Sequence, residues 1–184
     1  MSARNNHFTA FTGGPGAGKT SVIEALGAAG HRCSAEAGRA IIRQQVAIDG
    51  AALPWRDRAL YAEVMLSWEL RAFEAQAEAS GPVFFDRGLP DIVGYLRLEG
   101  LPVSAHVLKA AQDRRYARKV FLFPPWPEIF SGDAERKQTA EVAAATCRVM
   151  AEIYSELGYE LIEVPRVSVA ERARFILAAC RALC

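Results

Sequence analysis

The chain has 184 residues, of which 51% are hydrophobic and 23% are charged, as expected for a globular protein of one domain. Its 22 Lys and Arg residues nearly balance its 21 Asp and Glu residues, so the chain lacks the broad basic surface of a nucleic-acid-binding protein and we expect no nucleic-acid partner. No stretch reaches the length of a membrane span, and residues 1–11 contain no apolar run typical of a secretory signal, so we expect a cytoplasmic protein with no membrane partner.

Apolar, strand-like runs alternate with helical patterns along the chain. The patterns predict strands at 7–12, 31–35, 83–86, 119–123 and 159–164, of which the second is weak and rests on its position. They predict helices at 19–29, 36–49, 54–79, 89–99, 104–115 and 168–183, and a helix-rich segment at 126–157. This alternation predicts an α/β fold with a parallel sheet and helices on both of its faces. Because the composition is even, we expect a single domain over residues 1–184 with a mobile lid at about 126–140.

The most specific motif is the octet GGPGAGKT, which follows the first predicted strand and opens the first predicted helix. It matches the phosphate-binding pattern G-x-x-x-x-G-K-[ST], in which glycines let several backbone N–H groups converge on one anion. Lys19 would reach the β- and γ-phosphates, and Thr20 would offer its hydroxyl to Mg²⁺. No N-K-x-D guanine signature occurs at a strand end, so ATP is expected by default. The predicted phosphate site consists of Gly13, Gly14, Pro15, Gly16, Ala17, Gly18, Lys19, Thr20 and Ser21.

Asp86 and Arg87 follow the third predicted strand, at the end of a parallel sheet where ligands bind. Asp86 would hold Mg²⁺ directly or through water, as a Walker-B aspartate does. A ring-forming motor ATPase usually has Glu at the next position to activate water, whereas Arg87 suits the stabilisation of charge on a transferring phosphoryl group. The alternative is that Asp86 caps the following helix and pairs with Arg87.

Glu36 lies at the end of the second predicted strand, and Arg39 follows one helical turn later. The Glu36 carboxylate could take the proton from an attacking hydroxyl group, while Arg39 contacts phosphate or acceptor. The alternative is an ordinary surface ion pair at a helix start. The phosphoryl acceptor is expected between the end of this strand and the helix at 54–79.

Two further groups of residues have open interpretations. Arg136 and Lys137 follow a small, flexible trio of residues at 131–133, and could close over ATP and expel water, or could simply be a solvated helix start. Aromatic side chains assigned to the helix at 54–79 could stack on the acceptor, although core packing is favoured; they are Trp55, Tyr61, Trp68 and Phe73.

Six segments together resemble a known family, the small bacterial predicted ATPases called AAA-domain proteins: TGGPGAGKT, AEAGRAII, VFFDRGLPD, VFLFPPWPEIF, DAERKQ and LGYELIEVP. This family is related to the kinase domain that phosphorylates nicotinamide riboside and, more distantly, to nucleoside and nucleotide kinases. The resemblance covers about residues 8–177. It implies a three-layer P-loop kinase-type fold, whose five-stranded parallel sheet has the strand order 2-3-1-4-5, and it implies ATP and Mg²⁺.

The resemblance also implies roles for single residues. Glu36 falls where nucleoside kinases carry their catalytic base, Asp86 and Arg87 fall where they carry an acidic residue and an arginine, and Arg136 falls in the lid. Lys137 stands in place of a second lid arginine and cannot make the same bidentate contact. The expected catalytic residues are Lys19, Glu36, Asp86, Arg87 and Arg136, the acceptor-binding residues are Glu36, Arg39, Asp86 and Arg87, and the metal ligands are Thr20 and Asp86.

Three functions are compatible with these features. We favour a kinase that transfers the γ-phosphoryl group of Mg-ATP to a hydroxyl or phosphate group of a small nucleoside- or nucleotide-like molecule. The alternatives are an ATPase or nucleotide switch that acts on a protein partner, and a nucleotide-binding module without turnover. The sequence does not name the acceptor, and it leaves both monomer and homodimer open.

Overall fold

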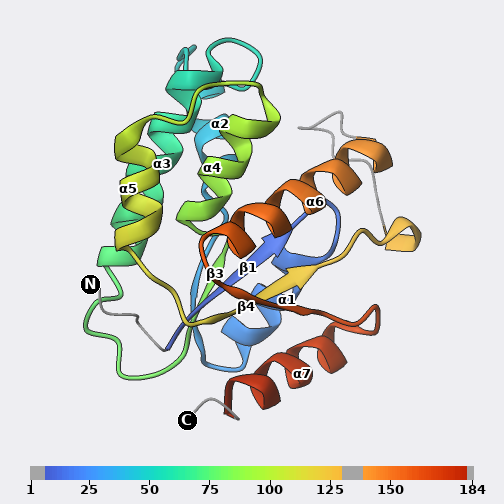
Figure 1. Cartoon of the computed structure of the whole chain (residues 1–184). Coiled ribbons are helices and arrows are strands. Elements are labelled where there is room, and N and C mark those ends of the chain that lie inside the picture. The colour runs from blue at the N-terminus through green and yellow to red at the C-terminus, as the bar shows by residue number, and fades with distance from the viewer. Residues whose placement is uncertain (1–6, 130–138, 182–184) are drawn as a thin grey trace.

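A single five-stranded sheet organises the chain, for which the computed structural model describes residues 7–129 and 139–181. All of its strand pairs are parallel and the strand order is β2-β3-β1-β4-β5 (Figure 1). The strands are β1 (Phe8–Gly13), β2 (Arg32–Ser34), β3 (Val83–Asp86), β4 (Lys119–Phe123) and β5 (Glu160–Glu163). The predicted sheet, its order and the short, weak second strand are thereby confirmed.

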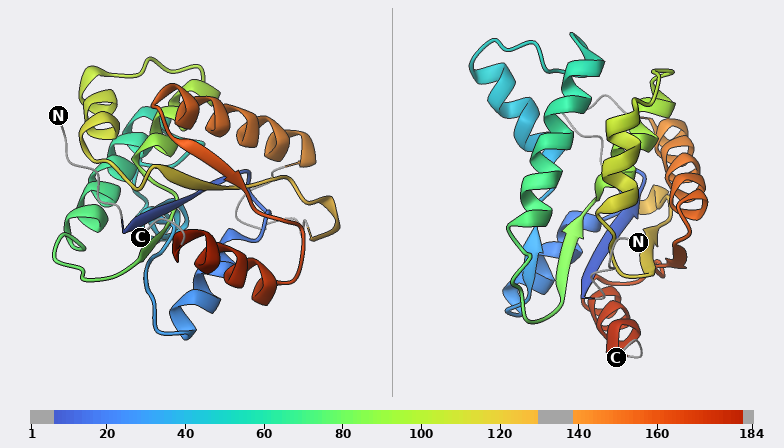
Figure 2. Two further views of the ribbon diagram at one scale, coloured as in Figure 1. Left: turned by 60° about the horizontal axis from the view of Figure 1, so that its bottom comes forward. Right: turned by 60° about the vertical axis from the view of Figure 1, so that its left-hand side comes forward.

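Helices cover both faces of the sheet, as Figures 1 and 2 show. α1 and α7 pack together on one face, and α6 covers the other, with α4 against α6 and both α3 and α5 against α4. The helices are α1 (Lys19–Ala28), α2 (Ala37–Ala47), α3 (Arg58–Glu74), α4 (Leu89–Leu98), α5 (Ala105–Asp113), α6 (Ala140–Glu156) and α7 (Val169–Arg181), with a 3₁₀ helix η1 (Pro127–Ile129) after β4. None of the helices in the described ranges is long and apolar enough to cross a membrane.

The strands are apolar on both sides because successive side chains along each strand point alternately into two hydrophobic cores. Phe11, Phe84 and Phe121 are fully buried in the core shared with α1 and α7. Phe8 and Phe85 are fully buried in the core on the α3 and α6 side. A sheet held between two cores has rigid strand ends, and these ends carry the residues of the site described below.

The third helix is shorter than the sequence predicts. α3 begins at Arg58 rather than at Pro54, because the Asp57 side chain accepts the N–H of Leu60 at 2.9 Å and caps the helix there. Trp55 therefore precedes the helix and is 58% exposed. The predicted helix-rich segment at 126–157 contains η1 and α6, while residues 130–138, and with them most of the predicted lid, lie outside the described residues.

Phe84→Ala should lower the free energy of unfolding by about 3–5 kcal/mol, because it removes a fully buried ring and leaves a cavity beside β1. Phe175→Ala is the matched control, since Phe175 is 37% exposed, and should cost about 1 kcal/mol or less. Urea unfolding of both variants measures the difference, and equal losses would contradict this account of the core.

Candidate active site

The octet forms a tight loop between β1 and the first turn of α1. Gly13 has φ 124°, and a Cβ atom at this position would collide with the carbonyl oxygen of Phe123 on β4, so only glycine fits. Gly16 and Gly18 also have positive φ, of 70° and 77°. The Lys19 ammonium folds back over the loop and donates to the carbonyl oxygen of Gly14 at 2.7 Å. Burial, aided by the nearby Arg87, lowers the pKa of Lys19 to about 8.

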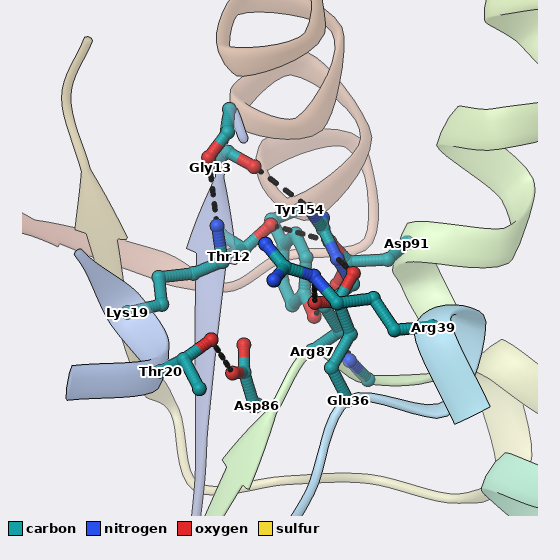
Figure 3. A network of polar contacts seen from close by, with 12 residues as sticks. Thr12, Gly13, Lys19, Thr20, Glu36, Arg39, Asp86, Arg87, Asp91 and Tyr154 are labelled. Carbon is teal, nitrogen blue, oxygen red and sulfur yellow. Dashed lines mark hydrogen bonds and ion pairs between the residues drawn. The ribbon is translucent and has the colours of Figure 1, made fainter. Parts of the chain in front are cut away.

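Thr20 and Asp86 meet at the end of the sheet, as Figure 3 shows. The Thr20 hydroxyl, in the first turn of α1, donates to Asp86 Oδ2 at 2.9 Å. Asp86 is buried, and its Oδ1 atom has no hydrogen-bond partner among the residues that the structure describes. Burial raises the pKa of the Asp86 carboxyl, against the opposing charge of Lys19. A hydroxyl and a carboxylate with an unused buried oxygen are ligands that Mg²⁺ takes, so these two residues fit the predicted metal.

Glu36 directly precedes α2, and its side chain is only 7% exposed. Its carboxylate pairs with Nε of Arg87 at 3.4 Å and with Nε of Arg39 at 3.3 Å. The alternative of a surface pair with Arg39 is therefore right about the pair and wrong about the exposure of Glu36. The contact with Arg87 brings the ends of β2 and β3 together beside the phosphate loop.

Arg87 lies between two carboxylates and the phosphate loop (Figure 3). Its Nη1 atom donates to Asp91 Oδ1 at 3.0 Å and to the carbonyl oxygen of Gly13 at 3.3 Å. Its φ of 83° is unusual for a residue other than glycine, and this conformation persists where surrounding contacts hold it. The residue that caps α4 is Gly88, whose N–H binds Asp91, so the alternative in which Asp86 caps this helix and pairs with Arg87 is wrong.

Asp91 is a buried carboxylate that accepts four hydrogen bonds. Its Oδ1 atom accepts from Thr12 at 2.8 Å and from Arg87 at 3.0 Å, and its Oδ2 atom accepts from the Gly88 N–H at 3.0 Å and from the Tyr154 hydroxyl at 2.7 Å. These partners come from β1, the β3–α4 turn and α6. Asp91 therefore fixes the phosphate loop relative to Arg87, and hence relative to Glu36.

A cavity of about 830 Å³ opens beside this network, between the end of β2 and α3, which is where the sequence predicts the acceptor. Its walls come from the phosphate loop, the start of α2, the chain before α3, and α3, α4 and α6. Glu36, Arg87 and Asp91 line its polar end. Trp55 and Tyr61 also line it, whereas Phe73 is buried in the core beside β1. The core-packing interpretation is thus right for Phe73 and incomplete for Tyr61, which is buried in a core and also lines the cavity, and it is wrong for Trp55, which is 58% exposed.

Glu69 is a second buried acid that lines this cavity, and it is 4% exposed. It forms no hydrogen bond or ion pair with any other residue in the described ranges. Burial, together with the negative charges of Asp91, Asp86 and Glu36, raises the pKa of Glu69 to about 8. Near pH 7 its carboxyl group is therefore mostly protonated and neutral.

Sequence reasoning missed three residues of the site. Asp91 could have been found from its position three residues after Gly88, the offset of a capping box. Glu69 could have been found as the one charged residue on a helix face made by Tyr61, Met65 and Phe73, which are spaced by four. Arg172 on α7 donates to the carbonyl oxygen of Ala17 at 3.0 Å, and no sequence pattern indicates this contact. The predicted lid residues Arg136 and Lys137 lie outside the described residues.

Comparisons with known proteins agree with this fold. The family model of an AAA domain matches residues 8–172. The deoxyadenosine kinase of M. mycoides, solved with the products dCMP and a flexible dCDP bound, is 15% identical and has a TM-score of 0.65 over 95% of this chain and 99% of that chain. Shikimate kinase from Acinetobacter baumannii, in complex with shikimate, is 15% identical and has a TM-score of 0.58 over 97% of this chain and 95% of that chain. At these identities the likeness shows the fold alone, and no curated protein matches the sequence.

Asp91→Asn should lower the free energy of unfolding by about 3 kcal/mol or more, because the amide has only one accepting oxygen for four buried or part-buried donors and removes one of the two carboxylates that pair with Arg87. Asp113→Asn, at the exposed pair with Lys109, should cost less than about 1 kcal/mol. Chemical denaturation compares the two variants. A loss for Asp91→Asn as small as that of the control would show that the network does not depend on this carboxylate.

The raised pKa of Glu69 makes stability depend on pH. In the folded chain Glu69 keeps its proton up to about pH 8, whereas in the unfolded chain a Glu side chain has its ordinary pKa of 4.5 and loses the proton at lower pH. The contribution of Glu69 to the free energy of unfolding is therefore lost as the pH rises from 4.5 to about 8. The Glu69→Gln side chain has no such proton to lose. The unfolding free energy of the variant minus that of the natural protein should therefore increase by at least about 1.4 kcal/mol from pH 5 to pH 8. Urea unfolding at both pH values measures this gain, and a constant difference would contradict it.

Proposed function

The chain belongs to the AAA-domain family, and from this premise we propose that it is a phosphotransferase that moves the γ-phosphoryl group of Mg-ATP to a hydroxyl or phosphate group of a small nucleoside- or nucleotide-like molecule. One observation carries the proposal: Pro15 of the phosphate loop and the Glu36–Arg87 pair line one cavity of about 830 Å³. Asp86, which accepts from the Thr20 hydroxyl, directly precedes Arg87. Hydrolysis would require room only for water, whereas this cavity suits a second substrate. The structural neighbours that share the fold are kinases of small molecules, which supports the same class of reaction.

The donor nucleotide would lie on the loop at residues 13–20. Backbone N–H groups of the loop and the N-terminus of α1 would bind its phosphates, and the Lys19 ammonium would turn from the Gly14 carbonyl oxygen to the β- and γ-phosphates. Thr20 and Asp86 would hold Mg²⁺, which supplies a positive charge that screens the phosphate oxygens and orients them.

The transfer step forms one bond and breaks another. For a hydroxyl acceptor, the acceptor oxygen forms a bond to the γ-phosphorus as the bond from that phosphorus to the β–γ bridging oxygen breaks, and ADP leaves with the electron pair. Glu36 takes the proton of the acceptor hydroxyl and later releases it to water. Arg87 lies beside Glu36 and Gly13, where its guanidinium group would stabilise the negative charge on the transferring group. The products are ADP, the phosphorylated acceptor and one proton.

Glu36→Gln should reduce transfer by about 100-fold or more, because an amide cannot accept the proton, while ATP binding changes by less than about threefold. ADP release and the phosphorylated product are measured together, with a panel of nucleosides, nucleotides and sugars as acceptors. Lys109→Ala, at an exposed pair on α5, is the control and should retain full transfer.

Two outcomes would contradict this proposal. Retained transfer in Glu36→Gln would remove Glu36 from the role of base. ADP release that no acceptor stimulates, and that a protein partner does stimulate, would favour the nucleotide switch instead.

A further inference from the structure

The guanidinium group of Arg172 packs directly against the phosphate loop. Arg172 lies on α7, is 3% exposed, and donates from Nη1 to the carbonyl oxygen of Ala17 at 3.0 Å. A Cβ atom at Gly18 would lie 2.8 Å from Nη1 and 2.9 Å from Nη2 of this arginine, so the guanidinium group fills the space that a side chain at position 18 would take. The last helix of the chain thereby contacts the loop on which the donor nucleotide would lie.

The positive charge of Arg172 has no carboxylate partner among the residues that the structure describes. Within the same ranges its buried Nε atom has no hydrogen-bond partner. Burial lowers the pKa of Arg172, but an arginine keeps its proton at neutral pH. A buried cation without an anion is unfavourable, and Arg172 lies near the N-terminus of α7, where the helix dipole also disfavours positive charge. The stability of α7 therefore does not account for an arginine at this position.

The hydrogen bond to Ala17 fixes the direction of the next backbone N–H group. A peptide unit is planar and trans, so the carbonyl oxygen of Ala17 and the N–H of Gly18 point to opposite sides. While Arg172 holds this oxygen toward α7, the N–H of Gly18 points away from α7. Gly18 is the N-cap residue of α1, and the N–H groups at a helix start are the ones that bind phosphate. A charged donor on the carbonyl oxygen also polarises the peptide and strengthens its N–H as a donor.

Contacts on its other side hold the guanidinium group against the loop. The Cζ atom of Arg172 lies 5.0 Å from the centroid of the Trp126 ring, a distance at which the ring attracts a cation. Arg166 Nε donates to the carbonyl oxygen of Pro125 at 3.1 Å, which ties the segment before α7 to the segment that carries Trp126. Arg172 is thus held in place before any ligand is bound.

From these observations, and resting on the donor-nucleotide site of the proposed function, we infer that Arg172 is a positioning residue for the phosphate loop. It holds the peptide between Ala17 and Gly18 with the N–H toward the bound phosphates, and its buried charge is balanced when a nucleoside diphosphate or triphosphate binds. Arg172 acts through the loop and takes no part in the transfer of a proton.

Calorimetric titration with Mg-ADP compares Arg172→Leu with the natural protein. Leucine keeps apolar packing and removes the guanidinium group, so the dissociation constant for ADP should rise about tenfold or more. Arg174→Leu, at an exposed position of the same helix, controls for net charge and should change this constant by less than about threefold. Ile176→Val, at a fully buried position of α7, controls for lost stability and should also stay within about threefold. An unchanged ADP affinity in Arg172→Leu, or an equal loss in Ile176→Val, overturns the inference.

Arg172→Lys tests whether the charged donor is the group that matters. It keeps the charge and can donate to Ala17, but lacks the planar fork, so its affinity for ADP should lie between those of the natural protein and Arg172→Leu. Affinity no higher than that of Arg172→Leu overturns the inference. If Arg172→Leu does not fold, Arg172→Lys carries the test, and an ADP affinity equal to that of the natural protein then overturns the inference.

The amide signal of Gly18 in nuclear magnetic resonance reports on the peptide itself. In the isotope-labelled natural protein, saturating ADP should move this signal downfield, because the amide comes to donate to a charged phosphate oxygen. The shift should be smaller in Arg172→Leu, whereas a role in stability alone would leave it unchanged in the folded variant. An equal shift in both proteins overturns the inference.

Binding of ADP does not require transfer, so this inference and the proposed function can fail separately. ADP binding that Arg172→Leu weakens, without a phosphorylated product from any acceptor, would support the inference and contradict the proposed transfer. Transfer by the natural protein, together with unchanged ADP affinity in Arg172→Leu, would support the proposed function and overturn the inference. No binding of ADP to the natural protein at millimolar concentration would overturn both.

Discussion

The carboxylate of Asp91 is the constraint on which the arrangement of the site depends. It accepts hydrogen bonds from the end of β1, from the β3–α4 turn and from α6, and all of them are shielded from water. A buried charge is stable only where its hydrogen-bonding capacity is used, so each of these partners must lie within a narrow range of positions. The phosphate loop starts one residue after Thr12, and Asp86 and Arg87 directly precede Gly88. Because Thr12 and Gly88 both donate to Asp91, this carboxylate fixes the positions of both parts of the site.

The same carboxylate determines what Arg87 can do. With Asp91 on one side and Glu36 on the other, the guanidinium group is balanced and held beside Gly13 in a left-handed backbone conformation. This conformation is unfavourable for a residue other than glycine by about 1 kcal/mol or more, and the surrounding contacts offset that cost. A positive charge held in place before a phosphate arrives requires little reorganisation when charge develops there, which is the requirement for electrostatic stabilisation of a transition state.

The buried acidic residues that share this region differ in the charged partners around them. Glu36 contacts two arginines, whereas Glu69 forms no such contact with the residues that the structure describes and is neutral near pH 7. Two similar side chains thus lie in different electrostatic surroundings. The difference arises from which residues face each carboxyl group, and it follows from the positions of β2 and α3 relative to β3.

The sequence by itself determined the strand and helix order, the phosphate loop and the choice of Thr20 and Asp86 as neighbouring polar residues of one site, because local signals specify these features: strand-like apolar runs, glycines at positions of positive φ, and a polar residue directly after a buried strand. It misplaced the start of α3, where the Asp57 cap overrides the preference of Pro54 for a first helical position. Only the tertiary structure decided that Asp91 joins β1 to α6, that Glu36 contacts Arg87, that Arg172 reaches the loop from α7, and that Glu69 lines a cavity. The physical reason is distance along the chain: these contacts join residues 51 to 155 positions apart, and their geometry comes from the packing of helices on the sheet, which no local pattern encodes.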